Sequence, residues 1–288
     1  MSLISKPFVS LAFLFLFIFS YRCIATELSD AGLYVLPYPQ QVTIGGDAFI
    51  VNNNLTIVLN KNHSAADAFA ANELVKDMKD QWNISAQISN HKGEFSIVLL
   101  RKKINAKHPK QSYQITVGKN EIIITGNDEE GLFYGTRTLL QLILKKGNVY
   151  QVPGMKITDW PAILQRAIHY DTKHHQDKMG YVKSFIKELA DYKVNMLVWE
   201  WEDKFAYPSH PEIGAPGAFT PAEIRDVTAY AKKYHIQIVP LVQGLGHVSF
   251  ILKWPQFAHL REIPASNFEF CPLKDGSYDL LFDLWKDA

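Results

Sequence analysis

Along the second half of the chain, segments with the hydrophobic pattern of a β-strand alternate with segments with the pattern of an α-helix. Three apolar runs have the length of β-strands, and they are residues 164–171, 194–199 and 235–242. Between them, apolar side chains recur at helical spacing over residues 181–192 and 221–234. Thr220 and Glu223 form a capping-box pattern at the start of the second helix. Strands that alternate with helices predict a parallel sheet.

The first half of the chain mixes both periods without strict alternation. A helix is predicted over residues 65–82 and a second over residues 130–144, with a strand at 95–100 between them. Residues 113–117 and 121–125 alternate across Gly118-Lys119-Asn120, which predicts an antiparallel hairpin. The sequence therefore predicts an α+β domain over residues 27–152 and an α/β domain over residues 160–288.

The N-terminus carries an apolar run from Phe8 to Phe19, which follows Lys6. The run is shorter than the ~20 apolar residues of a membrane span. It predicts a secretory signal peptide over residues 1–25 and an exported protein without an integral span, with an uncleaved anchor as the alternative. Cleavage removes Cys23 and leaves Cys271 alone, which excludes a disulfide framework.

The charge composition limits the classes of partner that the sequence predicts. The net charge is +1 and the basic residues are dispersed, so electrostatics gives no argument for nucleic acid or an acidic membrane surface. His174 and His175 are adjacent and point to opposite sides of an extended segment, and no further ligand stands at metal-binding spacing. No metal site is predicted.

Ionisable side chains gather at the predicted carboxyl ends of the three strands. They are Arg166, Asp171, Glu200, Glu202, Asp203 and His247. In a barrel these ends share one face, where active sites lie. A guanidinium and carboxylates suit sugar hydroxyls, and Trp199 or Trp201 offers a flat apolar face to a pyranose ring. The pattern predicts a sugar site.

Each of these residues also has a structural interpretation. Arg166 and Asp171 could form a structural ion pair, and His247 could be a hydrogen-bonded structural histidine. The solvated-loop interpretation is strongest for Glu202, whose side chain is expected to face away from the others. These alternatives stay open at the level of the sequence.

Four motifs resemble glycoside hydrolase family 20, the β-N-acetylhexosaminidases. Leu36-Pro37-Tyr38-Pro39 and the segment Asp128–Leu142, with the sequence DEEGLFYGTRTLLQL, are similar to that family's accessory domain. The motifs Ile157–Pro161 and Gln165–Asp171 are similar to the opening of its catalytic barrel. The resemblance extends from about Leu36 to the end of the chain.

The resemblance implies a fold and a chemistry. The fold is an α+β domain followed by a (β/α)8 TIM barrel, here truncated after about three βα units. The activity is exo-hydrolysis of terminal N-acetylglucosamine or N-acetylgalactosamine from a glycan by a retaining mechanism, without a cofactor. The substrate's own acetamido oxygen attacks the anomeric carbon, an Asp orients the acetamide, and the adjacent Glu protonates the leaving oxygen.

The resemblance also implies residue roles. Arg166 is expected to hold the hydroxyls of the terminal sugar, with Asp171, Glu200 and Trp201 as further substrate-binding residues. Asp203 and His247 are expected to support the acid Glu from behind. The catalytic Asp-Glu pair belongs to a fourth strand and is expected beyond Ala288, so none of the catalytic pair is assigned within the chain.

Two strand ends depart from the usual family pattern. Residues 200–203 read Glu-Trp-Glu-Asp where most members have a His-x-His-Leu-Thr-Asp type sequence, and Gln243 replaces an Asp. The ion pairing around that Asp is therefore open, although His247 is retained. The combination is similar to the hexosaminidase D-like branch of the family.

The length of the second domain leads to a further expectation. Residues 160–288 amount to about half of the ~250 residues of a complete barrel. We therefore expect a fragment of a hexosaminidase that is inactive alone. The alternative is a non-catalytic carbohydrate-binding or interaction module derived from a hexosaminidase. The choice of N-acetylhexosamine and the oligomeric state stay open.

Overall fold

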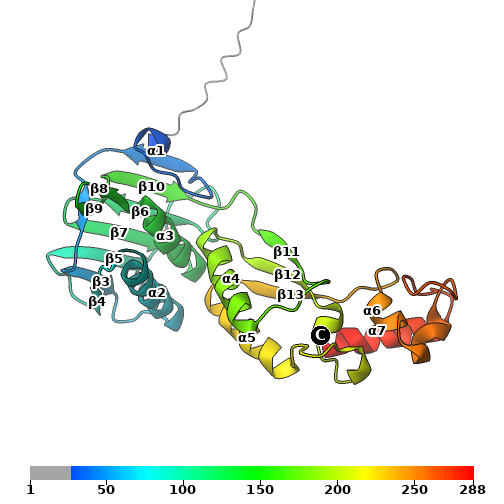
Figure 1. The fold of residues 1–288 in the computed structure, drawn as a ribbon. Coiled ribbons are helices and arrows are strands. Elements are labelled where there is room, and N and C mark those ends of the chain that lie inside the picture. The colour runs from blue at the N-terminus through cyan, green and yellow to red at the C-terminus, as the bar shows by residue number, and fades with distance from the viewer. Residues whose placement is uncertain (1–26) are drawn as a thin grey trace, which may run out of the picture.

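A computed structural model of the protein describes residues 27–288 and has two parts (Figure 1). The predicted signal peptide, residues 1–25, lies outside the described residues. The N-terminal part is a large sheet with two long helices on one face. The C-terminal part is a small parallel sheet with two helices, followed by a helical extension (Figure 1).

The N-terminal sheet has seven strands and mixed direction. In sheet order, the strands are β1 (Gln41–Ile44), β10 (Met155–Asp159), β6 (Tyr113–Val117), β7 (Glu121–Gly126), β5 (Phe95–Arg101), β3 (Leu55–Leu59) and β4 (Ala86–Ser89). The β6–β7 hairpin is antiparallel, as predicted. By contrast, β3 pairs in parallel with β4 and β5, and β5 in parallel with β7. Strand β10 begins after residue 152 yet pairs with β1 and β6 in this sheet.

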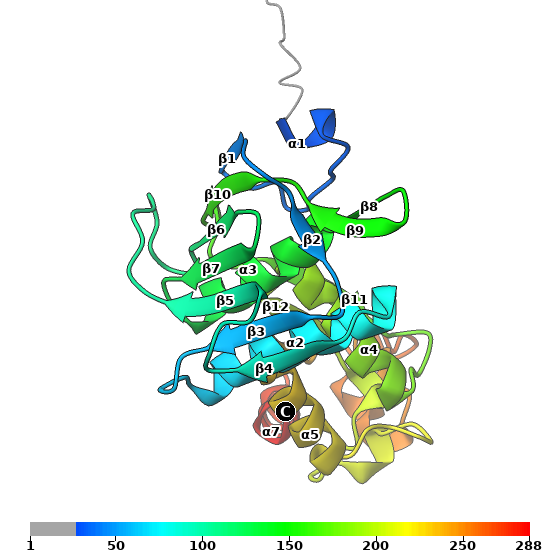
Figure 2. The ribbon, with the colours of Figure 1, turned by 90° about the vertical axis from the view of Figure 1, so that its left-hand side faces the viewer.

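Smaller elements complete this part. The second sheet consists of β2 (Phe49–Val51), β9 (Val149–Val152) and β8 (Leu144–Lys146), in that order, and a short helix α1 spans Glu27–Asp30. Figure 2 shows this second sheet beside one edge of the large sheet.

The two long helices begin at side-chain caps that the sequence supplies. Helix α2 (Ala65–Trp82) starts after Ser64, whose hydroxyl accepts a hydrogen bond from the Asp67 amide at 3.2 Å. Helix α3 (Glu129–Leu142) starts after Asp128, whose carboxylate accepts from the Gly131 amide at 2.7 Å. Almost every side chain of α3 is buried, since the helix packs against both the sheet and α2.

The close approach of α3 to the sheet gives a testable prediction for Gly131. A Cβ at this position would collide with the Ser112 carbonyl oxygen, a backbone atom that cannot rotate away. We expect Gly131→Ala to lower the free energy of unfolding by about 1–3 kcal/mol, measured by urea denaturation. Gly180→Ala in the first turn of helix α4 (Met179–Asp191) is the control, because no neighbouring atom lies within 4 Å of its added Cβ. Equal losses in both variants would contradict the prediction.

The C-terminal sheet confirms the predicted βα alternation. Its strands β11 (Ala167–Asp171), β12 (Met196–Glu200) and β13 (Gln237–Leu241) are parallel and adjacent in chain order. Helices α4 (Met179–Asp191) and α5 (Pro221–Lys233) connect them, and the Thr220–Glu223 capping box is present. Within residues 27–288 these strands do not close into a barrel.

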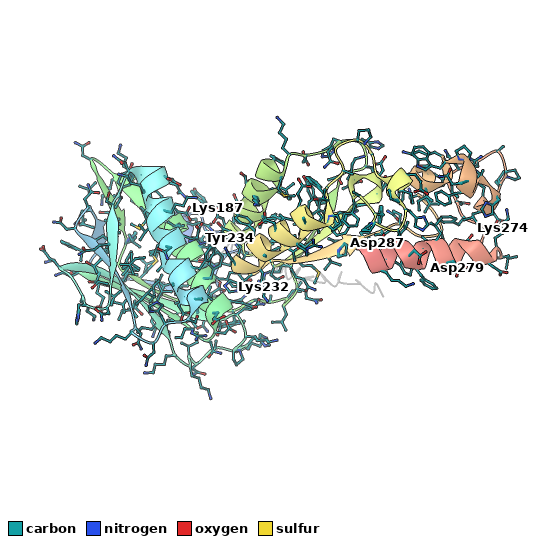
Figure 3. The ribbon with its side chains drawn as sticks, turned by 90° about the horizontal axis from the view of Figure 1, so that it is seen from below. Lys187, Lys232, Tyr234, Lys274, Asp279 and Asp287 are labelled. Atoms are coloured by element: carbon teal, nitrogen blue, oxygen red, sulfur yellow. The ribbon has the colours of Figure 1, made fainter. Side chains whose placement is uncertain are left out.

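Helical segments follow the carboxyl ends of the strands. They are the 3₁₀ turns η1 (Glu202–Lys204), η2 (Pro211–Ile213) and η3 (Pro255–Leu260), and the helices α6 (Ser249–Leu252) and α7 (Asp275–Asp287). Helix α7 buries Leu280, Leu281 and Leu284. It points away from the sheet, with Asp287 at its end near the sheet and Lys274 at its far end (Figure 3). None of the helices in residues 27–288 combines the length and apolarity that a bilayer crossing requires.

Buried charges join the two parts of the molecule. The Arg137 side chain of α3 is fully buried and lies 2.5 Å from Asp77 of α2 and 3.3 Å from Asp191 at the end of α4. Lys187 of α4 also pairs with Asp77. Figure 3 shows Lys187 beside α2, close to Tyr234, whose hydroxyl donates to Glu73 at 2.8 Å. This network fixes α4 and α5 against α2 and α3.

Candidate functional site

The carboxyl ends of the three parallel strands are level with one another. Asp171, Glu200 and Leu241 are register partners across β11, β12 and β13. A cleft of about 690 Å³ lies beyond these ends. Its lining residues come from the end of β11 and from the segments that follow the three strands, and they are Asp171, Lys173, His174, Glu202, Asp203, His247, Ser249, Phe250, Lys253, Asn267 and Phe268. The structure therefore gathers Asp171, Asp203 and His247 as predicted from the sequence.

Glu200 connects all three strand ends below the cleft. Its side chain is fully buried, with its carboxylate 3.1 Å from Lys173 Nζ and 3.1 Å from His169 Nε2. The side-chain amide of Gln243, which follows β13, also donates to this carboxylate. The Glu200 carboxylate lies at the end of β12, and the Gln243 amide follows β13. Gln243 therefore donates a hydrogen bond to a buried acid, at the position where the pattern described above usually has an Asp.

Two cleft residues have pKa values that favour their charged forms. The backbone amide of Lys173 donates to Asp171 and lowers the pKa of that exposed carboxyl. Burial opposes the charge of Lys173, but the hydrogen bond to Glu200 and the charges of Glu200 and Asp171 outweigh it and raise the lysine pKa. Asp171 is therefore a carboxylate that can accept hydrogen bonds from a ligand's hydroxyl groups.

Asp203 lies between two lysines. Its carboxylate is 2.5 Å from Lys204 Nζ and 3.2 Å from Lys253 Nζ. Burial opposes ionisation of Asp203, but the hydrogen bonds from Lys204 and Lys253 outweigh burial and lower its pKa. His247 also lines the cleft, with φ of 57°, and its ring contacts Phe268 edge-on at a centroid distance of 4.8 Å.

Glu202 contradicts its interpretation as a solvated loop residue. It is only 9% exposed and lines the cleft, with φ of 42°. Burial, followed by the charge of Glu200, raises the pKa of Glu202 to about 7. A carboxyl with such a pKa holds its proton in half of the molecules near neutral pH.

Arg166 does not join the other predicted residues. It precedes β11, at the opposite end of the strand from Asp171. Its Nε donates to the Lys193 carbonyl at 2.6 Å and its Nη1 to Gln111 Oε1 at 2.9 Å, while its guanidinium stacks on Tyr134 at 5.3 Å. Neither the expected sugar contact nor an ion pair with Asp171 has a geometric basis here, because these contacts place the guanidinium at the junction between the two parts.

Trp201 does not offer a surface to a ligand in this structure. It is 1% exposed and packs against Trp199 and Phe205, at centroid distances of 6.2 Å and 4.7 Å. Trp199 is also fully buried. These aromatic side chains form part of the hydrophobic core, so the expected stacking face for a pyranose is absent from this cleft wall.

Sequence reasoning missed His169, Lys173 and Lys253. His169 stands two residues before Asp171 and therefore shares its strand face, which is a signal that the sequence contains. Lys173 and Lys253 lie in loops, and their pairing with Glu200 and Asp203 depends on tertiary placement. Residues 27–288 contain no cluster of three or more His, Cys, Asp or Glu side chains suited to a metal ion.

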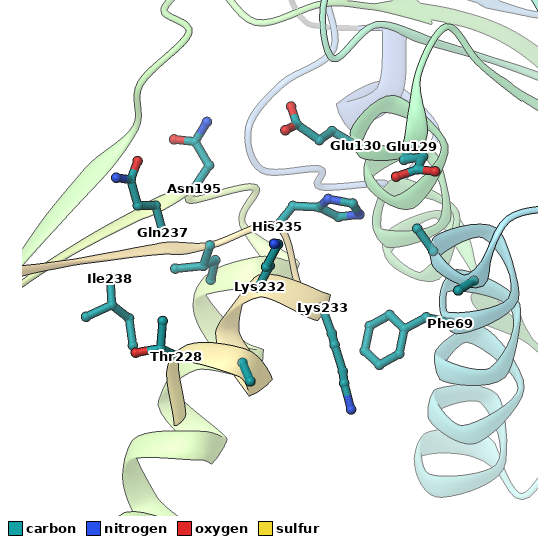
Figure 4. Close-up of a pocket in the computed structure, with 14 residues that line it drawn as sticks. Phe69, Glu129, Glu130, Asn195, Thr228, Lys232, Lys233, His235, Gln237 and Ile238 are labelled. Atoms are coloured by element: carbon teal, nitrogen blue, oxygen red, sulfur yellow. The ribbon is translucent and has the colours of Figure 1, made fainter. Parts of the chain in front are cut away.

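A larger cavity of about 840 Å³ lies at the junction of the two parts (Figure 4). Phe69 and Glu130 line it from the N-terminal part, and His235, Lys232 and Gln237 from the C-terminal part (Figure 4). It opens beside the start of β13, at the end of the sheet opposite to the polar cleft. Chemistry in parallel βα sheets occurs at the carboxyl ends of the strands, so the smaller cleft is the candidate site.

Fold and site together define a βα domain with a cleft of acidic and basic side chains at its strand ends. Residues 32–160 match the family model described as glycosyl hydrolase family 20, domain 2. Residues 165–267 match the model of the catalytic domain of the same family. The chain belongs to glycosyl hydrolase family 20 and covers part of the catalytic domain.

Curated relatives agree with this membership. The chain is 26% identical to a β-hexosaminidase of Porphyromonas gingivalis over 80% of this chain and 32% of that protein. It is 25% identical to β-hexosaminidase subunit A1 of Dictyostelium discoideum over 84% of this chain and 49% of that protein. Hexosaminidase D of Bos taurus is 32% identical over 40% of this chain and 34% of its own length. The chain thus spans about a third to a half of these relatives.

Solved structures share the fold. The chitobiase of Flavobacterium johnsoniae matches with a TM-score of 0.75 at 23% identity, over 90% of this chain and 43% of that chain. The family 20 β-N-acetylhexosaminidase of Streptomyces coelicolor matches with a TM-score of 0.73 at 24% identity, over 86% of this chain and 56% of that chain.

Proposed function

We propose that this chain carries the accessory domain and the first βα units of an exo-acting β-N-acetylhexosaminidase that removes terminal N-acetylglucosamine or N-acetylgalactosamine from glycans. The observation that carries the proposal is the polar cleft at the carboxyl ends of β11–β13, in a chain whose two parts both match family 20. We further propose that the apolar N-terminal segment directs the protein to an exported compartment.

The residues of the cleft have different proposed roles in binding a sugar. Asp171, whose pKa is lowered, can accept hydrogen bonds from ring hydroxyls. Lys173 fixes Asp171 from one side while it pairs with the buried Glu200. Asp203 and His247 are proposed to hold the general acid in position, and the lysine pair at Asp203 keeps that carboxylate charged. Arg166 and Trp201 are left out of this assignment because neither side chain reaches the cleft.

The proposed reaction is substrate-assisted, a known exception to hydrolysis by two protein carboxylates. The acetamido oxygen attacks the anomeric carbon, the glycosidic bond breaks, and a Glu donates its proton to the leaving oxygen. Water then opens the cyclic intermediate with retention. No adjacent Asp-Glu pair follows β11, β12 or β13 within residues 27–288, so the cleft residues of this chain are proposed to bind and orient the sugar.

A paired assay of the chain tests the proposal. We expect the purified chain, residues 26–288, to bind N-acetylglucosamine saturably without releasing the aryl group of an aryl N-acetylglucosaminide. Nuclear magnetic resonance titration measures the binding, and absorbance of the released phenol measures turnover. Glucose serves as the control ligand because it lacks the acetamide.

The two readouts contradict different parts of the proposal. Measurable turnover would show that a general acid is present among these residues, against the assignment of a binding and orienting role to them. Equal affinity for glucose and N-acetylglucosamine would contradict a hexosamine site.

A further inference from the structure

Glu202 lines the cleft, but none of the roles proposed above involves its carboxyl group. It lines the cleft with Asp171, Asp203 and His247, and it is 9% exposed. The hydrogen bonds and ion pairs of the described cleft residues join Glu200, Asp171 and Asp203 to lysines, histidine and glutamine, and Glu202 takes part in none of them. A nearly buried carboxyl group without a partner is costly unless it is neutral or receives a ligand.

The surroundings of Glu202 favour its protonated form. Four charged groups act on it: Glu200 from β12, Lys173 from the loop after β11, and Asp203 and Lys204 from its own 3₁₀ turn. Burial is the largest influence and Glu200 the next; both raise its pKa, which the two lysines only partly offset. The other ionisable groups that line the cleft are Asp171, His174, His247 and Lys253.

Its backbone gives a second, independent sign of constraint. Glu202 has φ of 42°, a conformation that a non-glycine residue adopts only when the surrounding structure enforces it. The preceding residue, Trp201, is locked in the aromatic core, and its amide donates to the Leu241 carbonyl at 3.1 Å. The turn that begins at Glu202 is therefore fixed to β13, and this holds the side chain at the cleft.

We propose that Glu202 contacts the substrate directly and donates a hydrogen bond from its protonated carboxyl group to an oxygen of the bound N-acetylhexosamine. A protonated carboxyl group has an O–H donor, whereas a carboxylate only accepts. Asp171 and Asp203 have lowered pKa values and remain acceptors, so a protonated Glu202 adds a donor beside them. This inference rests on the proposed function, since it requires a hexosamine in the cleft.

The proposal predicts a pH-dependent affinity. N-acetylglucosamine should bind to the purified chain most tightly below pH 6, and its affinity should fall about tenfold for each pH unit well above the Glu202 pKa of about 7. The affinity is measured by nuclear magnetic resonance titration between pH 5.5 and 8.5. The 13C shift of the Glu202 carboxyl carbon, followed without sugar, should titrate with the same midpoint.

Two substitutions, one in the cleft and one control, test whether the pH dependence of the affinity comes from Glu202. In Glu202→Gln the amide still donates but does not titrate, so affinity should stay near the low-pH wild-type value across the whole range. Glu188→Gln changes an exposed carboxyl group on α4, away from the cleft, and should follow the wild-type profile. A purely structural role of Glu202 would alter stability in Glu202→Gln without flattening the affinity profile, which separates the two roles.

The possible results discriminate between this inference and the proposed function. Sugar binding with no pH dependence, or with the same pH dependence in Glu202→Gln, overturns the inference and leaves the hexosamine site intact. No detectable sugar binding at any pH by a chain with a folded circular dichroism spectrum overturns the hexosamine site and this inference together.

Discussion

Arg137→Ala should lower the free energy of unfolding by about 3–5 kcal/mol, because it removes one partner of a fully buried ion pair. The guanidinium lies 2.5 Å from Asp77, 3.3 Å from Asp191 and 4.9 Å above the ring of Phe133. Without it, Asp77 keeps only Lys187 as a cationic partner. Urea denaturation followed by circular dichroism measures the loss.

Two further variants define what the loss means. Lys183→Ala breaks the exposed pair with Asp226 and should change stability by less than about 1 kcal/mol. Asp77→Leu combined with Arg137→Met replaces the buried pair by apolar side chains and should recover much of the loss. A cost for Arg137→Ala no larger than that for Lys183→Ala would show that the network does not hold the two parts together.

The same substitution tests a pKa relation. Burial raises the pKa of Asp191, and the charge of Arg137 opposes that effect. Removal of Arg137 should therefore raise the Asp191 pKa further, which a carbon-detected titration can follow. The pH at which Asp191 loses its charge would then report directly on the buried contact.

Elements with local signals could be predicted closely from the sequence. The bounds of α2 were predicted to the residue, and Ser64 and Asp67 supply a reciprocal cap at its start. The predicted start of β11 was three residues early, because Ile163 and Leu164 present their carbonyls to Arg166 instead of to a neighbouring strand. The parallel pairing of β3, β4, β5 and β7 was missed, since alternation within a strand does not identify its partners.

The candidate site was predicted in part, and the strand period explains the errors. Asp171 and Glu200 were placed correctly at strand ends, whereas Trp201 was expected to face a sugar. Side chains alternate along a strand, so Trp199 and Trp201 share a face while Glu200 points to the other. Arg166 stands five positions before Asp171 and thus at the opposite end of the strand, on the other face. The strand period separates Arg166 from Asp171, whereas Trp201 lies one residue beyond the end of β12 and is buried by packing against Trp199 and Phe205.

The burial of Glu202 had no comparable signal. A run of Glu, Asp and Lys after a strand is typical of a solvated loop, and local sequence cannot show that a later segment covers it. Here the segments after β13, including helix α6, bring Phe250, Lys253 and Phe268 to the lining of the cleft. These residues lie tens of positions away along the chain, so the desolvation of Glu202 is a tertiary effect.

Glu200→Ala should lower the free energy of unfolding by about 3–5 kcal/mol and abolish sugar binding, because three donors around the carboxylate lose their acceptor. Those donors are His169, Lys173 and Gln243, which come from β11, the loop after it and the segment after β13. Glu200 is thus the point through which the ends of all three strands are held together. Tryptophan fluorescence during urea denaturation is a suitable probe, since Trp199 and Trp201 flank the substituted position.

A graded comparison separates the charge of Glu200 from its hydrogen bonds. Glu200→Gln keeps an acceptor of the same shape, so the expected cost is smaller, about 1–3 kcal/mol. Glu188→Ala on the exposed face of α4 should cost no more than about 0.5 kcal/mol. If Glu200→Ala were as mild as Glu188→Ala, the convergence on Glu200 would be incidental. If Glu200→Gln were as severe as Glu200→Ala, the charge would be the essential property, and Lys173 would depend on it to keep Asp171 in place.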